Sequence, residues 1–303
     1  VEWQLRIAAG EPLPLQQHDV QLKGHAIEVR LYAEDPANQF LPQTGPVHVW
    51  HWEQLPGTRA DHGVLPGTDI SPFYDPMLAK MITHASDRTT AIRKLDRLLE
   101  NTVLLGTKTN KGFLRRLITQ ADFIQQGATT AFIPQHEAAL AEPATPDFRS
   151  LALAAVAWVG LSPMPSLHSA QRRVPVTLQV NQHKHRLEVH RQGSEFSVAS
   201  ADQHMTIQVH VLDAPRLIAS CDGIRRNAWF HIEGHNLYMD DGDSSIHATI
   251  STHAPALKAD AAGSGRLLAP MDGNLVDLLV EPGQSVQKGT TLAVLEAMKM
   301  EHP

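Results

Sequence analysis

The chain has 303 residues, of which 42% are hydrophobic and 19% charged, a composition typical of a globular protein with a buried core. Its 26 Lys and Arg residues against 32 Asp and Glu residues give a net charge of −6, and no basic run is present, which argues against a nucleic-acid partner. The longest apolar run, Leu151–Val159, is too short to span a membrane. The single cysteine, Cys221, excludes an internal disulfide and fits a cytoplasmic location.

The first section of the chain, residues 1–141, alternates between strand and helix patterns. Apolar and polar residues alternate with period two in residues 24–35, which predicts a strand with one buried face. Glu28 and Arg30 share its polar face, so the residues alone are explained by an ordinary surface ion pair. The chain begins at Val1 inside a helix-like pattern, so we expect it to be a fragment.

Two helices are predicted later in the same section. Asp87 is a good N-cap for a helix over residues 87–105, which ends at Gly106. A second helix begins near Asn110 and has a regular apolar stripe. Such mixed elements indicate an α+β domain.

The middle section, residues 148–251, changes character after a Pro-rich break. Residues 148–161 are apolar on nearly every face, which predicts a helix that is buried all round. Eight short β-prone runs separated by turn residues follow over residues 174–250. This order predicts an antiparallel β-barrel wrapped around one helix.

The last section begins with residues 252–265, rich in Ala, Pro, Gly and Ser, which are typical of a linker. Residues 266–303 are predicted to be all-β, with a turn at Gly283. Near their end stands the string Glu296-Ala297-Met298-Lys299-Met300, which is followed by Glu301-His302-Pro303. A lone Met-Lys-Met would be an ordinary exposed lysine, whereas the longer string with Pro270-Met271-Asp272-Gly273 upstream favours a functional site.

This last section resembles the biotinyl carrier domain family. The resemblance implies that Lys299, at the tip of a hairpin and flanked by Met298 and Met300, carries covalent biotin. Lipoyl domains have a similar design, but their acceptor lysine usually follows aspartate. The family's second half would follow Met300, so residues 266–303 are expected to be an incomplete biotinyl domain.

The first section resembles the C-terminal part of the biotin carboxylase family. The resemblance rests on separate blocks in the family's order: residues 24–36, 40–45, 74–80 and 106–110. It implies that Arg30 is catalytic and stabilises negative charge on the ureido oxygen of biotin, a task that suits a permanently charged guanidinium. Glu28, Tyr74 and Asp75 are the predicted supporting residues, with Asp75 orienting Arg30.

The resemblances together imply a fold class of multidomain α+β: the C-terminal part of an ATP-grasp biotin carboxylase domain, a helix-containing antiparallel β-barrel and an incomplete all-β biotinyl domain. The family's sites for ATP and Mg or Mn lie upstream of residue 1, so this chain alone is expected to be inactive. In the full-length subunit the implied activity is that of a ligase, which forms a carbon–carbon bond.

The layout, with carboxylase and carrier sections on one chain, is similar to the α subunits of 3-methylcrotonyl-CoA, geranyl-CoA or propionyl-CoA carboxylases. It implies a carboxyltransferase β subunit as partner, biotin protein ligase as modifying enzyme, self-association through the carboxylase domain, and transfer of the carboxyl group to an acyl-CoA. Two alternatives stay open: a carrier and assembly module without catalysis, and a lipoyl-type carrier of an acyltransferase complex.

No metal site is predicted, although the chain has 18 histidines. The segment from His231 to His235 places Glu233 one position too late for a zinc-protease motif, and it lies in a β-rich run where that motif needs a helix. Scattered surface histidines explain the pattern.

Overall fold

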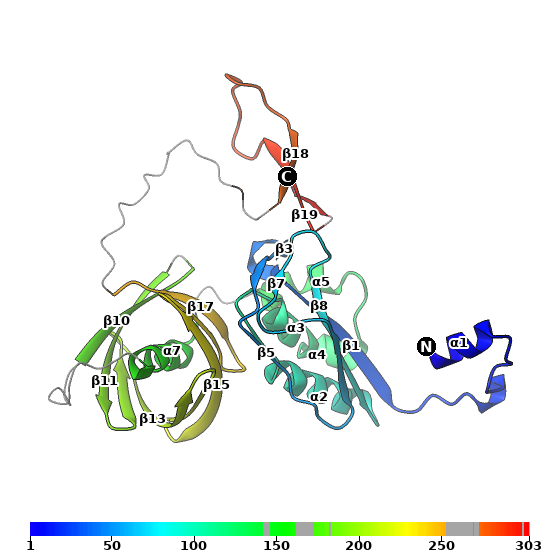
Figure 1. Ribbon diagram of the computed structural model, residues 1–303, viewed down its shortest axis with the longest axis horizontal. Coiled ribbons are helices and arrows are strands. Elements are labelled where there is room, and N and C mark those ends of the chain that lie inside the picture. Colours follow the sequence, from blue (N-terminus) through cyan, green and yellow to red (C-terminus); the bar gives the residue numbers. More distant parts are fainter. Residues whose placement is uncertain are drawn as a thin grey trace.

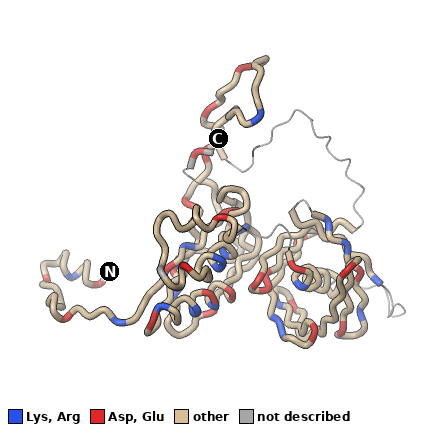
Figure 2. The backbone as a smooth tube through the Cα atoms, turned by 180° about the vertical axis from the view of Figure 1, so that it is seen from behind, with Lys and Arg blue, Asp and Glu red and all other residues tan. Residues whose placement is uncertain are grey.

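A computed structural model describes most of the chain as a mixed α/β section, a β-barrel and a small open sheet (Figure 1). Acidic and basic positions are interspersed along the described chain (Figure 2). None of its described helices is both long enough and apolar enough to cross a bilayer. The described residues are 1–141, 146–161, 173–181, 183–252, 269, 273–298 and 300–302.

A three-stranded antiparallel sheet organises the first section, in the order β1 (His25–Tyr32), β8 (Met77–Ala85), β6 (Thr58–His62). The apolar face of β1 packs with helices α2 (Arg88–Glu100) and α3 (Lys111–Ile118) in one core. The opposite face, which carries Glu28 and Arg30, is exposed. The alternation predicted for residues 24–35 therefore separates the core from the face that presents Arg30.

Shorter elements complete this section. Three two-stranded ladders pair β2 with β3, β4 with β7 and β5 with β9. Their bounds, with those of the remaining helices, are β2 Glu34–Asp35, β3 Leu41–Pro42, β4 Gly45–Pro46, β5 Val49–His51, β7 Asp69–Ile70, β9 Val103–Leu105, α1 Glu2–Ala8, α4 Ala121–Gln126, α5 Phe132–Gln135, α6 Glu137–Leu140, and the 3₁₀ turns Gln17–Asp19 and Pro36–Asn38.

The helix predicted over residues 87–105 is wrong at its C-terminal end. Helix α2 stops at Glu100, and Val103–Leu105 form strand β9, which pairs with β5. All three residues of β9 are buried. A short, fully apolar run has no periodicity that distinguishes a buried strand from the end of a buried helix, which explains the error.

The middle section is a closed, eight-stranded antiparallel barrel around helix α7 (Phe148–Leu161), as predicted. Strand β10 pairs with both β11 and β17, which closes the ring. Nine residues of α7 are buried, four of them alanines that let the strands approach closely. The strands are β10 Arg173–Val180, β11 His183–Gln192, β12 Glu195–Ala199, β13 His204–Asp213, β14 Arg216–Cys221, β15 Ile224–Glu233, β16 Asn236–Asp240 and β17 Ser245–Ile250.

The last section forms a three-stranded sheet, β18 (Asn274–Leu278), β19 (Ala293–Ala297) and β20 (Met300–His302). As predicted, its described residues form an open sheet and not a closed barrel; every residue of β18 is exposed. In Figure 1 this sheet lies above the first section, next to the label of β3.

Candidate functional site

Arg30 lies on the exposed face of β1, close to the end of that strand. It is directly opposite Lys80 of β8, which is in turn opposite Asp61 of β6. The β1–β8 register shifts between Leu31 and Tyr32, immediately after Arg30. A bulge of this kind bends the strand and changes the direction of nearby side chains, so the local structure around Arg30 is not that of a regular strand.

Two of the three predicted supporting residues, Glu28 and Asp75, act on Arg30 through their charge, and the third, Tyr74, is exposed to solvent. Tyr32 hydrogen bonds to the guanidinium and, with the negative charges of Glu28 and Asp75, raises the pKa of Arg30. The structure therefore brings Glu28 and Asp75 into the electrostatic neighbourhood of Arg30. Tyr74 is on the same loop as Asp75 and is 70% exposed.

Asp75 is held by the backbone of its own loop. Its Oδ1 accepts a hydrogen bond from the N–H of Met77 at 2.9 Å, and the N–H of Ala33 donates to the carbonyl of Pro76 at 2.9 Å. These bonds fasten the loop over residues 71–76 to the end of β1. The carboxylate of Asp75 is thus fixed at the position from which it acts on Arg30.

Glu34, two residues beyond Tyr32, is a member of the site that the sequence did not single out. Partial burial, together with the negative charge of Asp75, raises its pKa to about 7. A carboxyl group with such a pKa exchanges its proton near neutrality, which is a common property of functional sites. It lies within the block of residues 24–36, but nothing in that block distinguishes it from a surface glutamate.

The tip of the carrier hairpin contacts the same loop. The N–H of Met298 donates to the carbonyl of Pro72 at 2.7 Å, and Met298 is 2% exposed. Ala297 pairs with Met300, so the strands on either side of the tip are joined by a two-residue connection that begins with Met298 at φ 50°. Such a tight turn is suited to present a carrier lysine. Lys299 itself lies outside the described residues, as does the side chain of Met300.

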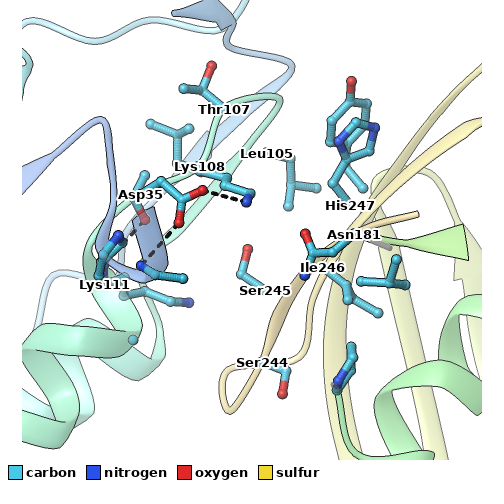
Figure 3. Close-up of a pocket in the computed structure, with 18 of the residues that line it drawn as sticks. Asp35, Leu105, Thr107, Lys108, Lys111, Asn181, Ser244, Ser245, Ile246 and His247 are labelled. Atoms are coloured by element: carbon cyan, nitrogen blue, oxygen red, sulfur yellow. Dashed lines mark hydrogen bonds and ion pairs between the residues drawn. The ribbon is translucent and has the colours of Figure 1, made fainter. Parts of the chain in front are cut away.

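A pocket of about 1120 Å³ lies between the first section and the barrel. Figure 3 shows Asp35, Lys108 and Lys111 on one side and the loop with Ser244 and Ser245 on the other. Its two lysines have acidic partners: Lys108 contacts Asp35 at 2.7 Å, and Lys111 contacts Asp240 at 2.5 Å. Because these charges are compensated, the pocket is better explained as a groove between two sections than as an anion site.

Histidines and aromatic residues fill the contact beside this pocket. The rings of His48 and His231 stack with centroids 4.0 Å apart, and His51 stacks on Trp229 at 4.4 Å. Burial lowers the pKa values of His51 and His231. In the part of the chain that the structure describes, no group of three or more His, Cys, Asp or Glu side chains is arranged to hold a metal ion.

Two families match this chain. Residues 28–135 match the family described as biotin carboxylase C-terminal domain, and residues 266–303 match the family described as biotin-requiring enzyme. Sections similar to these two families thus lie on one chain, and the barrel lies between them.

Curated relatives match the chain over a longer range than either family. The methylcrotonoyl-CoA carboxylase α subunit of Mus musculus is 34% identical over 100% of this chain and 46% of the relative. The propionyl-CoA carboxylase α chain of Ruegeria pomeroyi is 34% identical over 100% of this chain and 50% of the relative. A biotin carboxylase of Halalkalibacterium halodurans is 46% identical over 45% of this chain and 30% of the relative. The chain is therefore homologous over its whole length to acyl-CoA carboxylase α subunits, and it spans about half their length.

Proposed function

We propose that this chain is part of a biotin carboxylase and biotin carrier subunit of an acyl-CoA carboxylase, with Lys299 as the residue that is biotinylated. In the whole subunit, biotin on Lys299 is carboxylated with ATP, Mg or Mn, and bicarbonate. A carboxyltransferase partner then transfers the carboxyl group to an acyl-CoA. The full-length homology to two kinds of α subunit supports this assignment.

Arg30 is the proposed catalytic residue of the first step. When bound, biotin supplies a ureido nitrogen that accepts the carboxyl group. The guanidinium of Arg30 stabilises negative charge on the ureido oxygen, since it stays charged and its donors have a fixed direction. Tyr32 hydrogen bonds to that guanidinium, and the charges of Glu28 and Asp75 favour its charged form, which supports its assignment.

The contact between Met298 and Pro72 is the observation that carries this proposal. It joins the carrier hairpin to the loop that contains Asp75, whose charge acts on Arg30. A carrier tip that contacts this loop supports delivery of biotin to Arg30. The barrel and the carboxylase domain are the proposed contacts for the carboxyltransferase subunit and for a second copy of the subunit, respectively.

Biotinylation and carboxylation are tested on the full-length subunit. Biotin protein ligase, ATP and biotin are expected to modify the wild type, and Lys299→Arg is expected to abolish the avidin signal and the mass increase of biotin. Lipoylation of Lys299 without biotinylation would instead support the acyltransferase alternative. A biotinylated subunit without ATP-dependent carboxylation would support a carrier and assembly module.

A further inference from the structure

The block of residues 106–110 is part of the resemblance to biotin carboxylases but has no role in the proposed reaction. Its last residue, Asn110, is 5% exposed and lies at the start of α3. An asparagine at the N-cap of a helix usually accepts a hydrogen bond from the first turn of that helix. Asn110 makes no such side-chain cap. Its side chain is used elsewhere.

Asn110 hydrogen bonds to the edge of β1. Its Oδ1 accepts from the N–H of Tyr32 at 2.9 Å, and its Nδ2 donates to the carbonyl of Arg30 at 3.2 Å. Its own N–H donates to the carbonyl of Tyr32 at 3.1 Å. Asn110 thus makes the hydrogen bonds to β1, on both sides of Leu31, that a neighbouring strand would otherwise make.

These bonds satisfy groups that would otherwise lack partners. In the described sheet order β1-β8-β6, β1 is an edge strand, and alternate residues of an edge strand direct their N–H and C=O groups outward. The carbonyl of Arg30 and both backbone groups of Tyr32 point to that side, since Asn110 bonds to all three. An unpaired backbone group in such a half-buried place destabilises the fold, because it loses its bond to water without gaining another.

The position of these bonds matters for the direction of Arg30. On the other side of β1 the ladder to β8 is irregular between Leu31 and Tyr32, so the sheet alone holds this part of the strand less firmly. Tyr32, whose N–H is bound by Asn110, also hydrogen bonds to the Arg30 guanidinium. Asn110 therefore holds the backbone of both residues that set the guanidinium's position.

We propose that Asn110 is a positioning residue for Arg30: its amide group and backbone N–H brace the bulged edge of β1, so that the guanidinium faces the ureido oxygen of biotin. This inference rests on the proposed function of Arg30. The task requires one acceptor and one donor on the same planar group, which aspartate, serine and alanine do not provide in this geometry.

The test uses the full-length enzyme, with free biotin as carboxyl acceptor at saturating ATP and bicarbonate. Arg30→Met is expected to lower kcat for biotin carboxylation about 100-fold. Asn110→Ala is expected to lower it about 10-fold, with KM for ATP unchanged. Asn110→Asp keeps the acceptor for the N–H of Tyr32 but replaces the donor to the carbonyl of Arg30 with a second oxygen, so it is also expected to lose rate.

A double variant separates positioning from general destabilisation. In the Arg30→Met background, Asn110→Ala is expected to cause no further loss, because the guanidinium that it positions is gone. Thr83→Val is the matched control: Thr83 is fully buried on β8 and donates to the carbonyl of Ala91, away from Arg30, so kcat should be retained.

Each outcome decides between the two proposals. An Arg30→Met enzyme with normal kcat would refute the proposed role of Arg30 itself. If Arg30→Met loses rate but Asn110→Ala lowers kcat by the same factor with and without Arg30, Asn110 does not act through Arg30. Equal losses in Asn110→Ala and Thr83→Val, at equal shifts of Tm, would also overturn the positioning role.

Discussion

Lys111 and Asp240 form a buried ion pair between the carboxylase section and the barrel, with Nζ and Oδ2 2.5 Å apart. Their side chains are 7% and 1% exposed, and they are separated by 129 residues in the chain. Lys111 also donates to the carbonyl of Thr102 at 3.0 Å, and the N–H of Gly242 donates to Oδ1 of Asp240 at 2.9 Å. These additional bonds are what a buried pair needs to offset the loss of hydration.

Removal of one partner leaves a buried charge without compensation. We expect Lys111→Met to destabilise the folded chain by about 3 kcal/mol, measured by urea unfolding with tryptophan fluorescence. The double variant Lys111→Met, Asp240→Leu should recover much of this loss. As a control, Arg173→Met removes an exposed pair with Glu188 and should change stability by less than about 0.5 kcal/mol. Equal effects of the two single variants would contradict a buried, interface-spanning pair.

The histidine contacts between the two sections predict a loss of stability in acid. Burial, and then the neighbouring His48, lowers the pKa of His231, which Glu233 partly opposes; burial, Lys108 and His48 lower that of His247. The folded chain therefore binds fewer protons than the unfolded chain below their ordinary pKa of 6.5, and stability falls as pH drops through that value. Unfolding midpoints at about pH 7.5 and about pH 5.5 measure this effect.

His231→Gln is the control for this pH dependence. It removes one titrating ring from the stack with His48 and should flatten the curve between about pH 7.5 and about pH 5.5. His18→Gln, at an exposed position, should leave the curve as it is. A curve that is unchanged in His231→Gln would show that His231 does not contribute to the pH dependence in this range.

Glu34 is expected to give the opposite pH dependence of stability from the histidines, and Glu34→Gln tests this. The pKa of Glu34 is raised from 4.5 to about 7, so the wild type loses stability as pH rises between these values. The glutamine variant should be more stable by about 1 kcal/mol at about pH 8, after allowance for the partial exposure of the group. The difference should shrink towards pH 4.5, which paired urea titrations would reveal. Equal stability at all pH values would mean that Glu34 ionises normally.

The small residues on α7 set how closely the barrel can surround it. Ala155 is fully buried, so Ala155→Leu should overpack the core and lower stability by about 1–3 kcal/mol. The same substitution at the exposed Ala139 of α6 should change it by less than about 0.5 kcal/mol. Thermal unfolding of the two variants gives the comparison; a tolerant Ala155 would imply free space beside the helix.

Much of the fold could be predicted from local pattern. All eight barrel strands were expected within residues 174–250, because each alternates or is bounded by turn residues. Strand β9 could not be predicted in this way, because Val103–Leu105 is apolar throughout. Its partner strand, β5, lies about fifty residues earlier in the chain. Local periodicity carries no information about such a pairing.

The site was predictable to a similar degree. The family resemblance indicated Arg30 and Asp75, and the charge of Asp75 contributes to the raised pKa of Arg30. The bond of Asn110 to Arg30 and the pair of Lys111 with Asp240 depend on contacts 80 and 129 residues apart, which composition and spacing do not encode. The raised pKa of Glu34 likewise depends on burial and on Asp75, a distant residue in the chain.

The closure of the barrel restricts how another protein can bind it. Each of the strands from β10 to β17 has a neighbour on both sides over at least part of its length, so the ring offers little open edge to which an incoming strand could be added. We therefore expect a binding partner to recognise mainly outward-facing side chains or the loops at the two ends of the ring. Recognition by surface chemistry, and not by backbone pairing, makes the choice of partner depend on residues that can change without disturbing the core of the ring.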